Sequence, residues 1–84
     1  MIHMKLKISL DNELKKIFKS ELKINVKKNS KIYDYEKWDS IGNFNLLLSI
    51  EKKFKIKFNS QEFNKLNSLK EIKKVVTNKF KKRN

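Results

Sequence analysis

Residues 39–54 read DSIGNFNLLLSIEKKF, and this stretch decides the fold that we expect for the chain. Asp39 and Ser40 are typical of a helix start, because their side-chain oxygens can accept hydrogen bonds from the free N–H groups of the first turn. The apolar residues that follow recur at helical spacing, in a stripe wide enough to contact more than one neighbour. They are Ile41, Phe44, Leu46, Leu47, Leu48, Ile50 and Phe54.

A first helix and a long loop are predicted before this stretch. The spacing of the apolar residues predicts a helix over residues 11–23, with Asp11 as its N-cap. Residues 25–38 show no helical period, and we expect an ordered crossing loop, since loops of this length in small domains are usually functional or pinned. The expected apolar anchors of this loop are Val26, Ile32, Tyr33, Tyr35 and Trp38.

The beginning of the chain is ambiguous. Apolar and polar residues alternate from Ile2 to Leu10, which is a strand pattern. A single strand has no partner elsewhere in the sequence, so an extension of the first helix or an N-terminal arm over residues 1–10 fits equally well.

Two shorter units are predicted after the central helix. Residues 55–58 alternate as a short extended piece, and residues 59–62 fit a capping box that opens a short helix containing Phe63 and Leu66. Residues 68–71 fit a second capping box, followed by a helix from Leu69 to about Phe80. We expect residues 79–84 to form a basic tail.

These elements predict an all-α fold: a small four-helix bundle with three longer helices, one short helix and a long ordered loop between the first two. The 84 residues suit one domain, residues 1–84. The sequence has no cysteine and one histidine, His3, which argues against a disulfide scaffold, a metal site or a cysteine nucleophile. No catalytic pair or glycine-rich phosphate loop is present, so we expect no enzyme.

Localisation and charge give two further expectations. No apolar run approaches the ~18 residues of a membrane span, and no secretory apolar region opens the sequence, which favours the cytoplasm. Lys and Arg number 22 and Asp and Glu number 9, a net charge of +13. A charge this high favours a monomer.

The charge also raises a nucleic-acid-binding helical module as the alternative function. The lysines are spread through the chain and only Arg83 is an arginine, whereas base readout favours Arg, so a lysine-coated surface is the simpler interpretation and we expect no nucleic-acid partner. Residues 34–51 depart from this background, because four acids and one base give them a net charge of −3.

Three segments resemble one family. WDSIG at residues 38–42, followed by FNLL at 44–47, resembles the attachment motif of acyl carrier proteins, in which Asp-Ser and a large aliphatic residue open the second helix. LSIEKKFKIKF at 48–58 is similar to the family's end of that helix, and LNSLKEI at 66–72 to its turn into the last helix. The resemblance covers roughly residues 11–76.

The resemblance implies a carrier that is not itself an enzyme. A phosphopantetheinyl transferase would join phosphopantetheine from coenzyme A to the Ser40 hydroxyl, and the thiol of this arm would hold an acyl or aminoacyl group as a thioester. Asp39 would cap the helix and help to engage the transferase, and Ile41 would lie beside the arm. Gly42 would let the arm or a partner approach closely. Acyl-activating or acyl-transferring enzymes of fatty-acid or specialised biosynthesis would be the partners.

An acyl chain in such a carrier would enter between the last three helices. The candidate pocket residues, which serve equally well as plain core, are Phe44, Leu47, Ile50, Phe54, Phe63 and Ile72. We expect Trp38 to pack the loop onto the bundle and Glu51 to be a surface charge. The chain departs from the usual acidic character of the family, and residues 40–50 carry no charge, so partner recognition should depend on apolar contacts.

Overall fold

The computed structural model describes the backbone of residues 2–82 and the side chains of residues 10–80. The helices are α1 (Ile2–Leu22), α2 (Ser40–Phe54), α3 (Ser60–Lys65) and α4 (Leu69–Lys82). The described part of the chain has no named strand, only an isolated antiparallel bridge between Lys31 and Ser68. The expected all-α fold with three longer helices and one short helix is confirmed.

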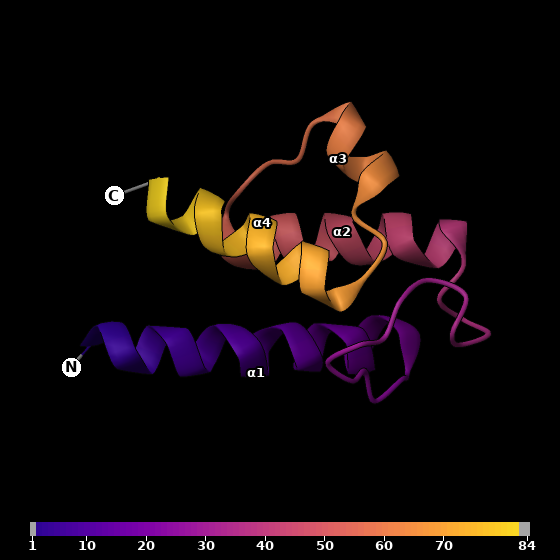
Figure 1. Cartoon of the computed structure of the whole chain (residues 1–84), viewed down its shortest axis with the longest axis horizontal. Helices are drawn as coiled ribbons and strands as arrows, with labels where there is room; N and C mark the ends of the chain where they lie inside the picture. The colour runs from indigo at the N-terminus through magenta and orange to yellow at the C-terminus, as the bar shows by residue number, and fades with distance from the viewer. Residues whose placement is uncertain (1, 83–84) are drawn as a thin grey trace.

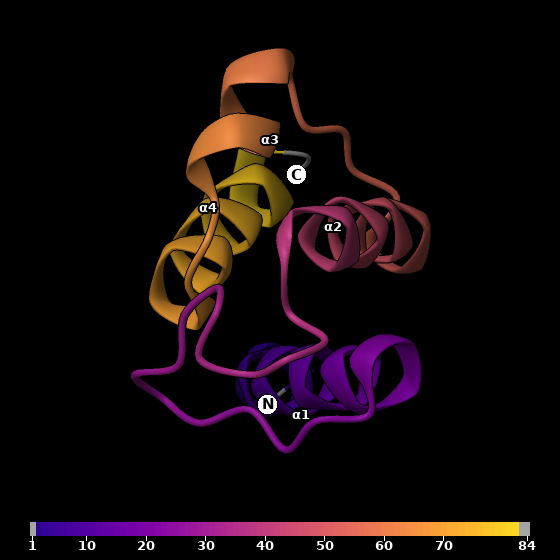
Figure 2. The same ribbon diagram turned by 90° about the vertical axis from the view of Figure 1, so that its right-hand side faces the viewer.

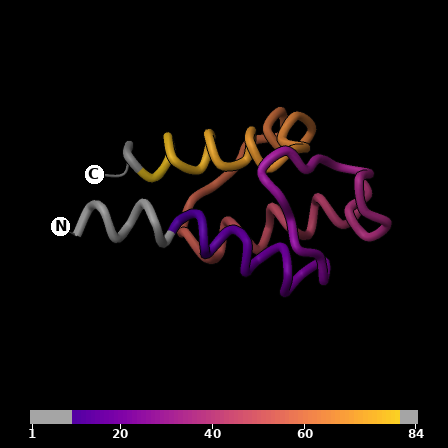
Figure 3. The backbone as a smooth tube through the Cα atoms, turned by 60° about the horizontal axis from the view of Figure 1, so that its bottom comes forward, coloured from indigo at the N-terminus to yellow at the C-terminus, as the bar shows by residue number. Residues whose placement is uncertain are grey.

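The long loop and the first turns of α2 and α4 lie at the same end of the bundle. α1 runs antiparallel to α2 and to α4, and the short α3 lies on the side of the bundle away from α1 (Figures 1 and 2). α2 and α4 both begin at the end where residues 23–39 cross over (Figure 3). The N-terminus of α2 therefore lies beside the long loop.

The core is built from the facing stripes of α1, α2 and α4 together with residues of the connecting segments, Trp38 among them. Trp38 is fully buried, as expected for a residue that packs the loop onto the bundle, and its ring meets the edge of Phe18 at a centroid distance of 4.8 Å. Burial of each large apolar side chain contributes about 1.5–3 kcal/mol. The other large, fully buried side chains among residues 10–80 are Phe18, Leu14, Leu46, Leu47, Ile50, Ile72 and Val76.

The predicted N-cap at Asp11 is wrong, and of the alternatives left open for the start of the chain, an extension of the first helix is confirmed over residues 2–10. α1 begins at Ile2 and passes through Asp11, which is not an N-cap but forms an ion pair with Lys73 of α4 at 3.0 Å. The strand pattern of residues 2–10 is overridden because no strand is available among the described residues, and Leu10 continues the buried helical stripe of Leu14. The side chains of residues 2–9, including His3, lie outside the described part.

The long loop is ordered by buried residues and by backbone bonds to the α3–α4 connection. Val26 is buried and Ile32 packs on the core, as expected of apolar anchors. The prediction that Tyr33 is also an apolar anchor is wrong, since its side chain is 68% exposed. The Ile32 N–H donates to the Asn67 carbonyl at 2.8 Å, and the Leu69 N–H donates to the Ser30 carbonyl at 3.1 Å. These two bonds form the isolated bridge and fix the loop beside the start of α4.

The ends of α2 and α3 are closed by side chains. The Glu51 carboxylate, expected to be a surface charge, also accepts the Phe58 N–H at 2.7 Å and so holds the segment that follows α2. The capping box of Asn59 and Glu62 is confirmed.

The last helix begins at Leu69, as predicted, but its capping box is incomplete and it ends later than expected. The Ser68 hydroxyl accepts the Glu71 N–H at 3.2 Å but also approaches the Glu71 carboxylate, so the reciprocal backbone bond of a second box is not formed. α4 continues to Lys82, so residues 79–82 are helical instead of a tail, and residues 83–84 lie outside the described part. None of the described helices combines the length and apolar character needed to cross a membrane.

Candidate functional site

Ser40 lies at the first position of α2 with an exposed side chain. Asp39 is the N-cap, as predicted: its Oδ1 accepts the Gly42 N–H at 2.8 Å, and its carbonyl accepts the Asn43 N–H at 2.8 Å. Within the described chain, the N–H groups of Ser40 and Ile41 make no hydrogen bond. The hydroxyl of Ser40 therefore lies beside free N–H donors and the positive end of a helix dipole, a setting that favours a phosphate.

Gly42 is required for a reason that differs from the prediction. A Cβ at this position would collide with the carbonyl oxygen of Lys37 and would lie 3.1 Å from Cδ2 of Leu22. The absence of a side chain at Gly42 therefore lets the chain's own loop and α1 pack against α2 at this point. The expectation that Gly42 makes room for the arm or for a partner finds no support in this geometry. The close approach lets residue 37 pass over the first turn of α2 immediately before Trp38.

Asn43 is a structural residue that sequence reasoning missed. Its side chain is 5% exposed. Its Oδ1 accepts the indole N–H of Trp38 at 2.9 Å, and its Nδ2 donates to the Leu66 carbonyl at 2.9 Å. This amide joins the loop, α2 and the end of α3. The sequence pattern could have indicated that Asn43 is buried. Asn43 lies three and four residues before the buried Leu46 and Leu47, so it faces the core from the same side of the helix.

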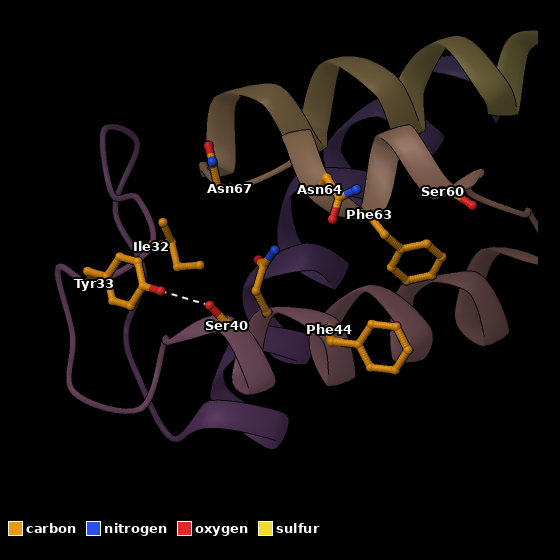
Figure 4. Close-up of a pocket in the computed structure, with 9 residues that line it drawn as sticks. Ile32, Tyr33, Ser40, Phe44, Ser60, Phe63, Asn64 and Asn67 are labelled. Carbon is orange, nitrogen blue, oxygen red and sulfur yellow. Dashed lines mark hydrogen bonds between the residues drawn. The ribbon is translucent and has the colours of Figure 1, made fainter.

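Tyr33 contacts the attachment candidate directly. The Tyr33 hydroxyl and Ser40 Oγ are 2.7 Å apart and share a hydrogen bond (Figure 4). Sequence reasoning missed this contact, since the two residues are joined by an irregular loop for which no periodic pattern fixes the direction of a side chain.

A cavity of about 510 Å³ opens beside Ser40. Other hollows on the described surface have volumes of about 490–510 Å³, so its size does not single it out; the presence of Ser40 in its lining does. The rings of Phe44 and Phe63 lie 5.1 Å apart on one side of the cavity, and the remaining lining is mixed, with amide side chains, hydroxyl groups and Ile32 (Figure 4). Its lining residues are Ile32, Tyr33, Ser40, Asn43, Phe44, Ser60, Phe63, Asn64 and Asn67.

The six pocket candidates fall into two groups. Phe44 and Phe63 line the cavity, and Phe44 is 50% exposed. Leu47, Ile50 and Ile72 are fully buried in the core, and Phe54 is buried with its ring 5.9 Å from Phe80. The structure thus brings two of the six together with Ser40.

The exposed face of α2 is apolar. Ile41 is 73% exposed and Leu48 is 36% exposed, so these members of the predicted stripe face outward with Phe44 and not into the core. The three residues follow one another at intervals of three and four and therefore share a side of the helix.

Glu62 of α3 is a carboxyl group whose pKa is shifted in the folded chain. Burial raises the pKa of the Glu62 carboxyl, but the Asn59 N–H and the Lys79 ammonium, 3.1 Å away, more than offset this, and the pKa is lowered below its usual value. This ion pair fastens α3 to α4. Among the described residues, no three His, Cys, Asp or Glu side chains gather as metal ligands.

The chain was compared with known proteins. Residues 12–76 match the family described as the phosphopantetheine attachment site. No curated protein and no solved structure matches the chain. The matched range runs from α1 to α4 and includes the whole of α2, α3 and the cavity. The chain therefore belongs to the phosphopantetheine attachment family, the acyl carrier proteins that hold phosphopantetheine covalently on a serine.

Proposed function

We propose that the chain is an acyl or aminoacyl carrier whose phosphopantetheine arm is attached to Ser40. One observation carries the proposal: within the matched range, Ser40 offers an exposed hydroxyl at the N-terminus of a long helix, directly beside a cavity. With no cysteine in the sequence, the arm would supply the thiol that holds the cargo as a thioester.

The attachment step needs little from the carrier itself. A phosphopantetheinyl transferase would direct Ser40 Oγ to the phosphorus of coenzyme A that bears the pantetheine. An Oγ–P bond forms, the pyrophosphate P–O bond breaks, the adenosine bisphosphate leaves, and the hydroxyl proton passes to a base of the transferase. The Asp39 carboxylate accepts the Gly42 N–H through Oδ1 and so serves the helix start.

Ser60 provides the structural comparison for this assignment. It lines the same cavity and also begins a helix, but α3 has only 6 residues, whereas α2 has 15. A longer helix presents more aligned peptide dipoles to a phosphate. The hydroxyl of Ser40, and not that of Ser60, also lies within hydrogen-bond distance of a phenol among the described contacts.

The partners should recognise an apolar helix face with little charge. Ile41, Phe44 and Leu48 are exposed on α2, and the helix carries no charge until Glu51. Contact through these residues would suit dedicated enzymes of a specialised pathway better than a synthase that relies on a basic patch, because the chain carries +13 and would repel it. Cytoplasmic location and a monomeric state are part of the same proposal.

The test is the intact mass of the folded protein after incubation with coenzyme A, magnesium and a promiscuous phosphopantetheinyl transferase. The parent chain and Ser60→Ala should each gain one phosphopantetheine, and Ser40→Ala should gain none. If the parent gains no mass, or if Ser40→Ala is modified as readily, the assignment fails.

One observation favours the alternative of anion or nucleic-acid binding. Lys15, Lys28, Lys70 and Lys73 line one hollow of about 490 Å³, although Lys73 is also paired with Asp11. This function requires binding to DNA or RNA that persists at physiological salt and is unchanged in Ser40→Ala.

A further inference from the structure

We propose that the phenol of Tyr33 holds the phosphate of the arm, so that Tyr33 is a positioning residue of the attachment site. The inference rests on the proposed function of Ser40. Its starting point is the 2.7 Å distance between the Tyr33 hydroxyl and Ser40 Oγ, the atom that would carry the phosphate.

The backbone of Tyr33 is held in a conformation that needs support. Its φ is 73°, in the left-handed region, where a Cβ is crowded by the following carbonyl. The other positive-φ residues of the described chain, Lys23 and Lys55, follow the ends of α1 and α2, where this conformation is a common way to stop a helix. Tyr33 ends no helix, so this explanation does not apply to it.

A set of local hydrogen bonds enforces the turn. The Tyr33 N–H donates to the Trp38 carbonyl at 2.7 Å, and the Lys31 N–H donates to the Asp34 carboxylate at 2.9 Å. The bond from the Ile32 N–H to Asn67 joins the same turn to the bundle. The turn is therefore anchored to the buried Trp38, while the ring that it places over Ser40 remains 68% exposed. Because the Tyr33 ring is largely exposed, hydrophobic burial contributes little free energy to holding it there. The side-chain hydrogen bond that Tyr33 makes in this position is the one with Ser40.

The contact should become stronger when Ser40 is modified. In the unmodified chain two neutral hydroxyls share one hydrogen bond, and both can still bond to water. After attachment, Oγ becomes an ester oxygen and the phosphate beside it carries a negative charge. The phenol O–H then donates to a phosphate oxygen, and hydrogen bonds to charged acceptors are roughly twice as strong as neutral ones. The phenol and the free N–H groups at the start of α2 would hold the phosphate from two directions.

Tyr35 provides a matched control. Its hydroxyl lies 2.9 Å from the Ser30 hydroxyl, in the same loop but away from Ser40. The same hydroxyl lies 3.5 Å from the Asn25 carbonyl oxygen. Tyr33→Phe and Tyr35→Phe therefore each remove one phenol oxygen with its hydrogen bonds and keep the ring. Only the first change removes a group beside the attachment oxygen.

The experiment uses the chain with phosphoserine placed at position 40 by genetic-code expansion, which puts a phosphate on the same oxygen without a transferase. The second pKa of this phosphate is measured by ³¹P NMR. Tyr33→Phe should raise it by about 0.5 relative to the parent, because a donor to the dianion is lost. Tyr35→Phe should leave it unchanged. In the phosphopantetheine form, Tyr33→Phe alone should move the ³¹P resonance.

The outcomes separate this inference from the proposed function. If Tyr33→Phe titrates like the parent, or if Tyr35→Phe shifts the pKa as far, the phenol does not hold the phosphate and the inference is overturned. If the parent chain accepts no phosphopantetheine from a transferase while the phosphoserine chains titrate as expected, the carrier proposal fails and the contact of Tyr33 with a phosphate on Ser40 stands.

Discussion

Replacing Asn43 with Ala should destabilise the fold, because it removes a buried side chain that makes two hydrogen bonds. The Asn43 amide is buried, and each of its partners can take only one role in a hydrogen bond. The indole N–H of Trp38 can only donate, and the Leu66 carbonyl can only accept. Ala supplies neither group. Both partners are then left without a hydrogen bond, in an interior that water does not reach readily.

The size of the effect follows from these two orphaned groups. Each unsatisfied buried donor or acceptor costs about 1–3 kcal/mol. Ala is a better helix former than Asn by roughly 0.5 kcal/mol, which offsets a small part of the loss. We therefore expect the free energy of unfolding to fall by about 2–4 kcal/mol. A domain of this size is stable by only about 4–12 kcal/mol, so the change is large.

The assay is equilibrium unfolding in urea, followed by the fluorescence of Trp38. With a slope near 1 kcal/mol per molar for a small domain, the midpoint of Asn43→Ala should fall by about 2 M or more. Asn45→Ala is the control, since Asn45 lies on the exposed side of the same helix. That variant should be unchanged or slightly more stable. A loss below about 0.5 kcal/mol in Asn43→Ala would refute the view that the buried amide joins loop and helices.

Two other predictions concern the start of α2 and the ion pair between α3 and α4. Gly42→Ala should lower the thermal midpoint, with a net loss of about 1–3 kcal/mol despite a better helix propensity, because the new Cβ meets the Lys37 carbonyl; unchanged or increased stability would contradict that contact. Glu62→Gln tests the ion pair with Lys79. Because the pKa of Glu62 is lowered in the folded state, its charge stabilises the fold above the unfolded value near 4.5, and this contribution is lost as the pH falls below it. Urea unfolding should therefore show a difference in stability between parent and variant at pH 7 that shrinks as the pH falls through the lowered pKa of Glu62; a pH-independent difference would rule out the carboxylate as the cause.

Local signals in the sequence were sufficient for much of the fold. The start of α2 at Asp39 and Ser40, the capping box at Asn59 and the burial of Trp38 all depend on residues close in sequence, and the structure confirms each. The start of α1 could not be predicted in this way. A pattern that alternates apolar and polar residues is compatible with a strand or a helix, and the choice depends on which partners the rest of the chain provides.

The site was predicted less completely, for a related reason. Ser40 could be named from its motif, but its neighbours Tyr33 and Asn43 act through contacts that cross an irregular loop. Periodicity fixes the face of a helical residue, and for Asn43 that face was readable. It does not fix the direction of Tyr33, which depends on a left-handed turn held by backbone bonds to Trp38.

The central claim is that Ser40 carries the arm, and the protein purified from the cells that make it tests this most directly. Trypsin cleaves after Lys37 and Lys52, releasing a peptide that contains both Ser40 and Ser49. Tandem mass spectrometry of this peptide should show one added phosphopantetheine, with fragment ions that place it on Ser40. An unmodified peptide throughout, or fragment ions that place the group on Ser49, would contradict the account.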